Sequence, residues 1–138
     1  MAGPALARRI AILRKQFAMK KIMIVEDNEL NMKLFNDLLQ AQGYSTVQSS
    51  DGKDVINLAR QSRPHLIIMD VKLPGVSGIE LTRKLKADAE LKTIPILAVT
   101  AFAMKGDQEK VMDSGCDDYL PKPISIPVFL ETVAKYLG

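Results

Sequence analysis

Short apolar runs recur along the chain from residue 20 onward, and each is followed by a segment whose apolar residues have helical spacing. Apolar runs of this length are typical of strands that are buried on both faces of a sheet. Three such strands are predicted, at residues 22–25, 66–69 and 94–99. A more polar strand at residues 44–48 suits a sheet edge, and a short fifth strand ends at residues 119–120.

Polar residues mark the starts of the first two predicted helices. Asn28 and Asp51 are the expected N-caps, because short polar side chains accept hydrogen bonds from the free N–H groups at a helix start. The first helix has an apolar stripe of Leu30, Leu34, Leu38 and Leu39 and ends at Gly43. The second is expected to face the core with Val55, Ile56, Leu58 and Ala59.

Three further helices complete the pattern. One begins at Gly78 after a turn at Pro74 and Gly75, one covers residues 105–113 before Gly115, and one covers residues 126–137 after Ser125. Strands that alternate with helices predict a parallel sheet with helices on both faces. The expected fold is therefore α/β, a doubly wound five-stranded parallel sheet of order 2-1-3-4-5 with five helices. In such folds the functional residues lie beyond the carboxyl ends of the strands.

Polar residues stand at these predicted strand ends. Glu26 and Asp27 follow the first strand, Asp70 the third, Thr100 the fourth and Lys122 the fifth. Each residue alone fits a helix cap or a loop, but their joint position at the ends of separate units indicates a site. In the predicted strand order, these residues converge at one edge of the sheet.

Three carboxylates in one pocket would raise one another's pKa or recruit a cation, because like charges about 4 Å apart repel by roughly 4 kcal/mol at an effective dielectric constant of about 20. Oxygen ligands without His or Cys favour Mg²⁺, which takes its remaining ligands from water and phosphate. A cation, an ammonium and a hydroxyl donor would together stabilise a phosphoryl group that moves toward a carboxylate. Asp70 is the predicted nucleophile.

Four stretches of the sequence resemble the response-regulator receiver family, whose members are also called CheY-like. They are residues 25–28 (Val-Glu-Asp-Asn), 68–74 (Ile-Met-Asp-Val-Lys-Leu-Pro), 99–101 (Val-Thr-Ala) and 122–123 (Lys-Pro), in the family's order and spacing. The resemblance covers residues 20–138, which are expected to form one receiver domain after a basic extension at residues 1–18.

The resemblance implies a role for each site residue. Asp70 would be phosphorylated, and Asp27 would bind Mg²⁺ directly, with Mn²⁺ as a substitute. Glu26 would support the metal through water, and Asp70 and the backbone carbonyl of Lys72 would supply further ligands. Many receivers have Asp at the position of Glu26, so the longer side chain here is expected to alter the metal geometry.

The resemblance also implies a conformational switch. Thr100 would move toward the phosphoryl group, Lys122 would form an ion pair with it, and the ring of Tyr119 would turn into the space that Thr100 leaves. The Lys122–Pro123 peptide bond is expected to be cis. Residues 102–104 would form a partly apolar docking surface, with ordinary core packing as the alternative, above all for Met104.

Residues 26–35, 98–107 and 122–125 are most similar to single-domain regulators of cell division within this family. The implied function is that of a single-domain response regulator in a two-component phosphorelay, which signals through protein–protein contacts. It would assist its own phosphorylation and dephosphorylation and would otherwise not be an enzyme. The implied partners are sensor histidine kinases and phosphatases similar to DivJ and PleC, together with downstream protein targets. We expect no output domain, and we expect a monomer or weak dimer.

Charge and cysteine content place the protein more broadly. Four of the 19 basic residues and none of the 16 acidic residues lie in residues 1–18, so the rest carries a net charge of about −1 and gives nucleic acid little attraction. The chain lacks an apolar run of the ~20 residues that a membrane span needs. Its single cysteine, Cys116, suits a reducing compartment. A cytoplasmic location is therefore expected, and the resemblance implies recruitment to the cell poles through partners.

The basic segment itself predicts a short amphipathic helix, with Leu6, Ile10, Leu13 and Phe17 at helical spacing. Four interpretations remain open. It could be a targeting or surface helix, a helix on an anionic membrane, or an ordinary packing helix. It could also be an upstream extension that depends on the choice of start codon, because Met19 would serve as a natural start.

Other classes of protein share parts of this pattern. A flavodoxin-like electron carrier has the same fold class, but the acidic residues after the first strand would repel a phosphate without a metal. A phosphatase with a nucleophilic Asp would want a second acid where Lys72 stands, and a histidine phosphodonor would have to use His65. A receiver domain of a hybrid kinase or larger regulator is the nearest alternative.

Overall fold

The computed structural model describes residues 3–9, 20–101 and 105–137. Five strands form one parallel sheet in the order β2-β1-β3-β4-β5. They are β1 (Lys21–Val25), β2 (Ser45–Ser49), β3 (Leu66–Asp70), β4 (Ile96–Thr100) and β5 (Asp118–Pro121). The predicted α/β class, strand order and polar edge strand are confirmed. The bounds of the strands differ from the predicted bounds by no more than two residues.

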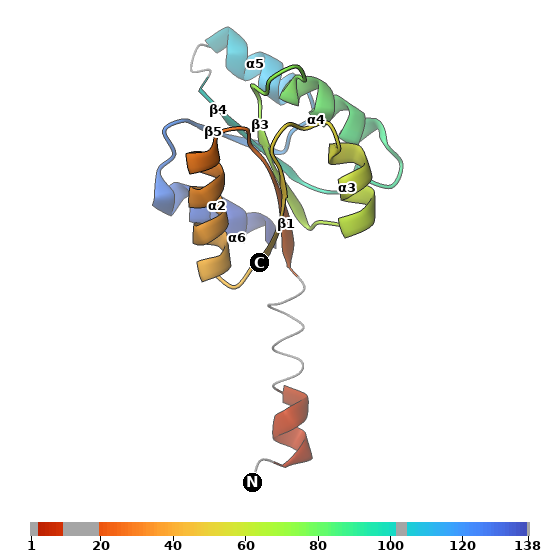
Figure 1. Ribbon diagram of the computed structural model, residues 1–138, viewed down its shortest axis with the longest axis vertical. Coiled ribbons are helices and arrows are strands. Elements are labelled where there is room, and N and C mark those ends of the chain that lie inside the picture. The colour runs from red at the N-terminus through yellow and green to blue at the C-terminus, as the bar shows by residue number, and fades with distance from the viewer. Residues whose placement is uncertain (1–2, 10–19, 102–104, 138) are drawn as a thin grey trace.

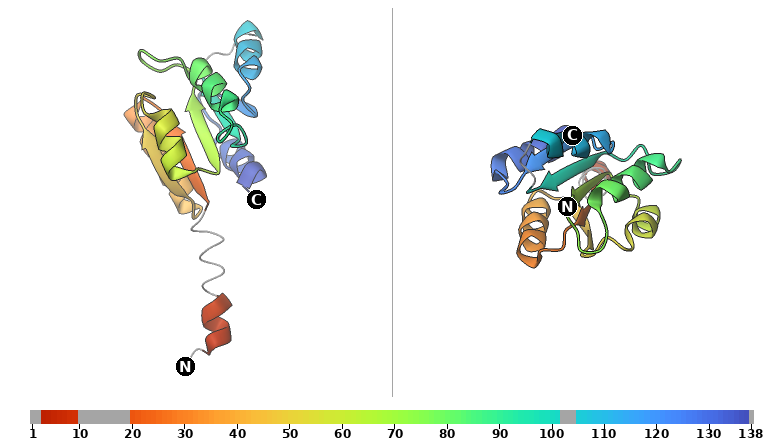
Figure 2. Two further views of the ribbon diagram at one scale, coloured as in Figure 1. Left: turned by 90° about the vertical axis from the view of Figure 1, so that its right-hand side faces the viewer. Right: turned by 90° about the horizontal axis from the view of Figure 1, so that it is seen from above.

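Two layers of helices cover the sheet (Figures 1 and 2). The helices are α2 (Glu29–Ala41), α3 (Val55–Ser62), α4 (Gly78–Ala87), α5 (Lys105–Asp113) and α6 (Ile126–Leu137). Buried side chains of α3, α4 and α5 pack on one face, and those of α2 and α6 pack on the other. The five predicted helices are therefore all present, and a further short helix occurs at residues 4–9.

Alternate residues of the central strands supply the two cores. In β1, Met23 and Val25 belong to the core beneath α3, α4 and α5, while Ile22 and Ile24 belong to the core beneath α2 and α6. Strand β3 divides in the same way. Every residue of β3 is buried, which explains why its sequence is a continuous apolar run up to Asp70.

The apolar stripe predicted for α2 is wrong in part. The buried residues of the helix are Met32, Phe35 and Leu39, whereas Leu30 is 79% exposed and Leu34 is 39% exposed. The helix has leucines on two faces, and leucine spacing alone does not show which face the sheet covers. Phe35 decides it, because its ring stacks on that of Phe129 in α6 with centroids 5.2 Å apart.

The predicted helix caps have different outcomes. Asn28 is confirmed as the N-cap of α2, since its side chain accepts a hydrogen bond from the Asn31 N–H at 3.0 Å. The prediction for Asp51 is wrong. Residue Asp54 is the N-cap of α3, and the Asp51 carboxylate instead accepts from the Lys53 N–H in the preceding turn.

Helix α4 begins in close contact with the end of β3. The Gly78 N–H donates to the Val71 carbonyl at 2.9 Å, and a Cβ atom at position 78 would lie 2.2 Å from the Asp70 carbonyl oxygen. Glycine is the residue that permits this approach. The first turn of α4 therefore packs directly against the backbone of Asp70 and Val71.

Part of the basic N-terminal segment is described. Residues 4–9 are helical, and Leu6 is 48% exposed. The predicted positions Ile10, Leu13 and Phe17 lie outside the described residues, as do residues 102–104 of the predicted docking surface. Among the described residues, no helix has the length and apolar character to cross a membrane.

Candidate functional site

The carboxyl ends of four strands bring the predicted site residues to one edge of the sheet. Glu26 follows β1 directly, Asp70 is the last residue of β3, Thr100 is the last residue of β4, and Lys122 follows β5. Because the strands are parallel, their ends lie side by side. The Lys122 N–H also donates to the Thr100 carbonyl at 2.8 Å, which joins the last two of these segments.

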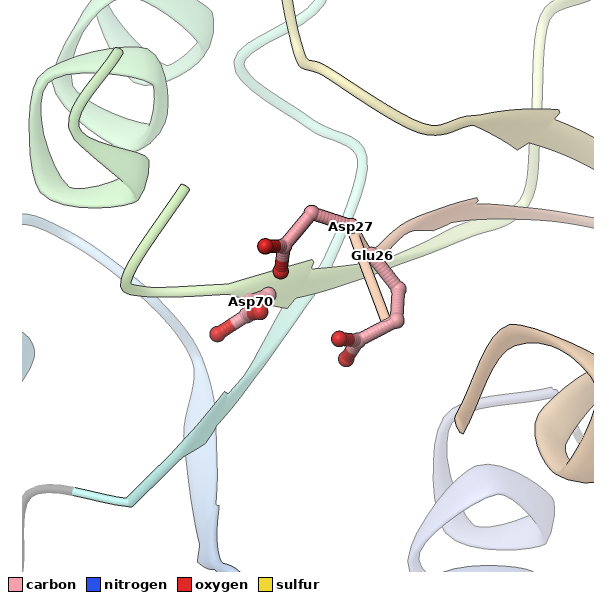
Figure 3. A group of neighbouring side chains, drawn as sticks. All are labelled: Glu26, Asp27 and Asp70. Atoms are coloured by element: carbon pink, nitrogen blue, oxygen red, sulfur yellow. The ribbon is translucent and has the colours of Figure 1, made fainter. Parts of the chain in front are cut away.

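Three carboxylate groups gather at this edge (Figure 3). Glu26, Asp27 and Asp70 each offer an oxygen atom, and these atoms lie within 4.8 Å of one another. Glu26 and Asp70 are buried, at 1% and 4% exposure, whereas Asp27 is exposed. The cluster therefore has two shielded carboxylates and one that faces solvent.

Lys122 places a positive charge beside the two buried acids. Its Nζ atom lies 3.1 Å and 3.3 Å from the two carboxylate oxygens of Glu26, and 3.4 Å from Oδ2 of Asp70. The lysine side chain is 20% exposed. The Lys122 ammonium thus forms ion pairs with both buried carboxylates, and it lies closer to Glu26 than to Asp70.

The pKa of Asp70 is raised to about 7 from its usual 3.8. Burial is the largest cause, and the negative charge of Glu26 adds to it. The Lys122 ammonium and the Lys72 N–H, which donates to Asp70 Oδ1 at 3.1 Å, act in the opposite direction. The cluster thus lacks sufficient positive charge of its own to keep Asp70 fully ionised.

The residues present fit a hard divalent cation. All three acids are oxygen ligands, their oxygens are close enough to share one ion, and they carry more negative charge than Lys122 balances. A cavity of about 420 Å³ opens beside them and is lined also by Lys72 and Lys122. There is space in it for a small anionic group as well as an ion.

Of the remaining predicted residues, Lys72 lines this cavity, and Thr100 and Tyr119 lie on the neighbouring strands β4 and β5. Thr100 is buried at 1% exposure, at the end of the strand beside Asp70. Lys72 forms an isolated bridge with Ser77, and its backbone is next to the Asp70 carboxylate. Tyr119 is partly buried and packs at the margin of the core beneath α3, α4 and α5. The Lys122–Pro123 peptide bond is cis, as predicted.

Sequence reasoning missed one participant. The Asn28 backbone N–H donates to Glu26 Oε1 at 3.1 Å, so the residue that caps α2 also orients the first acid. The Glu26–Lys122 contact was not predicted either. It joins residues 96 positions apart, and its geometry depends on how far a Glu side chain reaches across the folded site.

A doubly wound sheet with an acid cluster, a buried Asp and a Lys at its carboxyl edge is the architecture of a phosphoacceptor switch. Comparison with known families agrees, because the response regulator receiver domain family matches residues 22–134. The chain belongs to this family. It is therefore a signalling switch of a two-component phosphorelay, with histidine kinases as its class of partner. The family match favours this function over the flavodoxin-like electron carrier.

Within this family, the chain is similar to response regulators named DivK. The chain is 58% identical to the polar-differentiation response regulator DivK of Brucella anthropi over 119 residues, which cover 86% of this chain and 97% of that protein. The protein of the same name from Brucella ovis is 57% identical over the same length and coverage.

Solved structures show the same fold. The receiver domain of the sensor histidine kinase PA1611 from Pseudomonas aeruginosa, which has a magnesium ion in its active-site cleft, is 32% identical with a TM-score of 0.80. The match covers 86% of this chain and 98% of that domain. The chemotaxis protein CheY4 of Vibrio cholerae is 26% identical, also with a TM-score of 0.80, over 86% of this chain and 99% of that one.

Proposed function

We propose that Asp70 accepts a phosphoryl group from a phosphohistidine of a sensor kinase. A carboxylate oxygen of Asp70 would form the new P–O bond while the P–N bond to the imidazole breaks and the imidazole leaves with its electron pair. The observation that carries this proposal is the position of Asp70. It is a buried carboxylate at the end of β3, with Lys122 3.4 Å away, facing a cavity of about 420 Å³.

The acid cluster would hold Mg²⁺, or Mn²⁺ in its place. Asp27, Asp70 and the Lys72 backbone carbonyl would be direct ligands, and Glu26 would act through water. When bound, the ion would neutralise charge on the phosphoryl oxygens during transfer. The chain's own residues would do the rest: Lys122 would pair with a phosphoryl oxygen, and the Thr100 hydroxyl would donate to another. The same groups would assist both phosphorylation and dephosphorylation.

The signal would leave the site through Thr100 and Tyr119. Movement of Thr100 toward the phosphoryl group would open space beneath the partly buried ring of Tyr119, which would turn inward. That movement would reshape the surface formed by α5, β5 and α6. We expect the output to be a change in protein–protein contacts, from a monomer or weak dimer formed by residues 20–138.

The relatives suggest the cellular setting. Their name, polar-differentiation response regulator, supports a role in cell-division or polarity control, with sensor kinases and phosphatases similar to DivJ and PleC as partners. Recruitment to the cell poles by such partners would follow. The basic residues 1–18 would be a separate extension that precedes the receiver domain.

A phosphorylation assay tests the proposal. The full chain is incubated with Mg²⁺ and labelled acetyl phosphate or a phosphorylated histidine kinase, and the label is treated with hydroxylamine, which cleaves acyl phosphates. We expect hydroxylamine-labile label on the wild type and none on Asp70→Asn. The matched control is Asp37→Asn, which changes an exposed acid on α2 and should label normally. Undiminished labelling of Asp70→Asn would refute the assignment.

A further inference from the structure

The Glu26 carboxylate has two hydrogen-bonding partners within the site, the Asn28 N–H and the Lys122 ammonium. Its Oε1 atom accepts from the Asn28 N–H at 3.1 Å, and both of its oxygens contact Lys122 Nζ, at 3.1 Å and 3.3 Å. The residue is 1% exposed. A backbone donor on one side and an ammonium on the other thus fix this carboxylate in one orientation.

The Lys122 ammonium contacts two acids, Glu26 and Asp70. Its distance to Asp70 Oδ2 is 3.4 Å, longer than either distance to Glu26. An ammonium that pairs with a phosphoryl group on Asp70 must approach that side of the cavity, and each step in that direction weakens the contacts with Glu26. The two arrangements therefore compete for one positive charge.

We propose that Glu26 is a positioning residue that holds Lys122 in the unphosphorylated protein and so opposes the active arrangement. The inference rests on the proposed function, since it assigns a role toward the phosphoryl group on Asp70. In it, Glu26 sets how readily Lys122 moves to the phosphoryl group, in addition to any support that it gives to a metal.

The length of the Glu side chain is the variable that tests this role. An Asp at position 26 keeps the charge but is shorter by one methylene, roughly 1.5 Å along the chain. Contacts of 3.1 Å and 3.3 Å to Lys122 would then open beyond hydrogen-bonding distance. Glu26→Asp thus separates the holding of Lys122 from the charge of the acid cluster.

The first experiment measures how firmly the ammonium is held, with no metal and no phosphoryl analogue present. Nitrogen-15 NMR of lysine ammonium groups reports their hydrogen exchange with water, and the Lys122 signal is assigned by its loss in Lys122→Arg. We expect a slowly exchanging Lys122 signal in the wild type and at least fivefold faster exchange in Glu26→Asp. Absence of a slowed signal in the wild type, or unchanged exchange in the variant, would overturn the proposal.

Two controls accompany this measurement. Lys86 is an internal reference, because its Nζ atom donates to the carbonyls of Lys92 and Ile94 and to the Asp117 carboxylate, remote from the site. Its exchange should be the same in both proteins. Glu80→Asp makes the same chemical change in an exposed ion pair with Arg83 and should leave Lys122 unaffected.

The second experiment measures the affinity for beryllofluoride, a phosphoryl analogue, at saturating Mg²⁺. We expect Glu26→Asp to bind it about fivefold more tightly, equivalent to ~1 kcal/mol, because Lys122 no longer has to leave Glu26. In a Lys122→Met background, the same substitution should change the affinity less than twofold. An equal change in both backgrounds, or none in either, would overturn the proposal, since Glu26 would then act without Lys122.

The two experiments separate this inference from the proposed function. If the wild type binds no beryllofluoride and takes no phosphoryl label on Asp70, the proposed function fails. The ammonium measurement would still decide whether Glu26 holds Lys122, because it needs neither metal nor phosphoryl group.

Discussion

Asp70 is a carboxyl group in an environment that favours its neutral form. Burial and the charge of Glu26 raise its pKa to about 7, while Lys122 offsets part of the effect. A carboxyl whose pKa is higher in the folded than in the unfolded protein binds more protons when folded between the two pKa values. The ionised Asp70 is therefore a cost to stability that a bound cation would relieve.

The consequence can be measured as a function of pH. With EDTA present, the contribution of Asp70 to the free energy of unfolding should fall as the pH rises from about 4 to about 7, the interval between its unfolded and folded pKa values. Asp70→Asn lacks this titration. The stability of the variant relative to the wild type should thus increase by about 1–3 kcal/mol between pH 5 and pH 8. Urea unfolding of both proteins at pH 5 and pH 8 measures this change. If the difference in the free energy of unfolding between variant and wild type were the same at both pH values, the prediction would be wrong.

Cys116 is a second residue whose neutral form the fold favours, and here the effect makes the side chain unreactive. It is 6% exposed, its Sγ atom lies 3.2 Å from the Val111 carbonyl, and burial, with the charge of Asp117, raises the pKa of its thiol to about 11. At pH 8 the thiolate fraction would be on the order of 10⁻³. Iodoacetamide should therefore modify the folded protein at least a hundredfold more slowly than the urea-unfolded protein. Comparable rates, measured by mass spectrometry, would show that the thiol is accessible.

At the scale of the elements, most helices and strands could be predicted from the sequence, because local signals agree with the final packing. Asn28 precedes an apolar helix and caps it, and the apolar run at β3 is buried on both faces. The stripe of α2 could not be predicted from leucines alone. Leu30 and Leu34 have the right spacing, but the sheet covers the face that contains Phe35.

The two faces of α2 should differ sharply in their effect on stability. Phe35→Ala removes a buried ring that stacks on Phe129, and we expect it to lower the free energy of unfolding by about 3–5 kcal/mol. Leu34→Ala and Leu30→Ala should each cost less than about 1 kcal/mol, because these side chains already contact water. Chemical denaturation of the three variants measures the free energy of unfolding. Equal decreases in all three would show that the leucine stripe also faces the core.

The junction of β3 and α4 has little room for change. Gly78→Ala would place a methyl group 2.2 Å from the Asp70 carbonyl oxygen and 2.7 Å from the Val71 Cα. Backbone must shift to accept it, so we expect a loss of about 1–3 kcal/mol and weaker phosphorylation of Asp70.

Gly106 in α5 provides the matched control. A Cβ atom there would meet nothing within 4 Å, and alanine is the better helix former, so Gly106→Ala should be neutral or slightly stabilising. Thermal melts and the acetyl phosphate assay on both variants test the pair. If Gly78→Ala retained wild-type stability and labelling, the close approach of α4 to β3 would not matter for the site.

At the scale of the whole molecule, the strand order and the convergence of the site could be predicted, because parallel strands bring their carboxyl ends to one edge. The contacts between side chains within the site could not be predicted from the sequence. Glu26 and Lys122 are 96 residues apart, and the pairing depends on side-chain reach and on the Asn28 N–H that holds the acid.

Binding of a divalent cation should stabilise the entire fold. The cluster of Glu26, Asp27 and Asp70 exists in the folded chain alone, so Mg²⁺ at millimolar concentration should raise the Tm, whereas Na⁺ at matched ionic strength should not. Asp27→Ala should abolish the increase, and Asp37→Ala, on the exposed part of α2, should preserve it. An unchanged Tm of the wild type in Mg²⁺ would count against the metal site.

The amino end of the sheet has a different character from the carboxyl end. Lys86 of α4 contacts the Asp117 carboxylate at 2.8 Å, and the same carboxylate accepts from the Ile96 N–H, so one lysine ties together the starts of β4 and β5. This end is fixed by contacts that the proposed switch does not use. It is therefore a suitable place for a reporter dye. With Cys116 shielded, a single cysteine introduced at exposed Lys92 could be labelled selectively and paired with a second label near the site to follow activation by fluorescence.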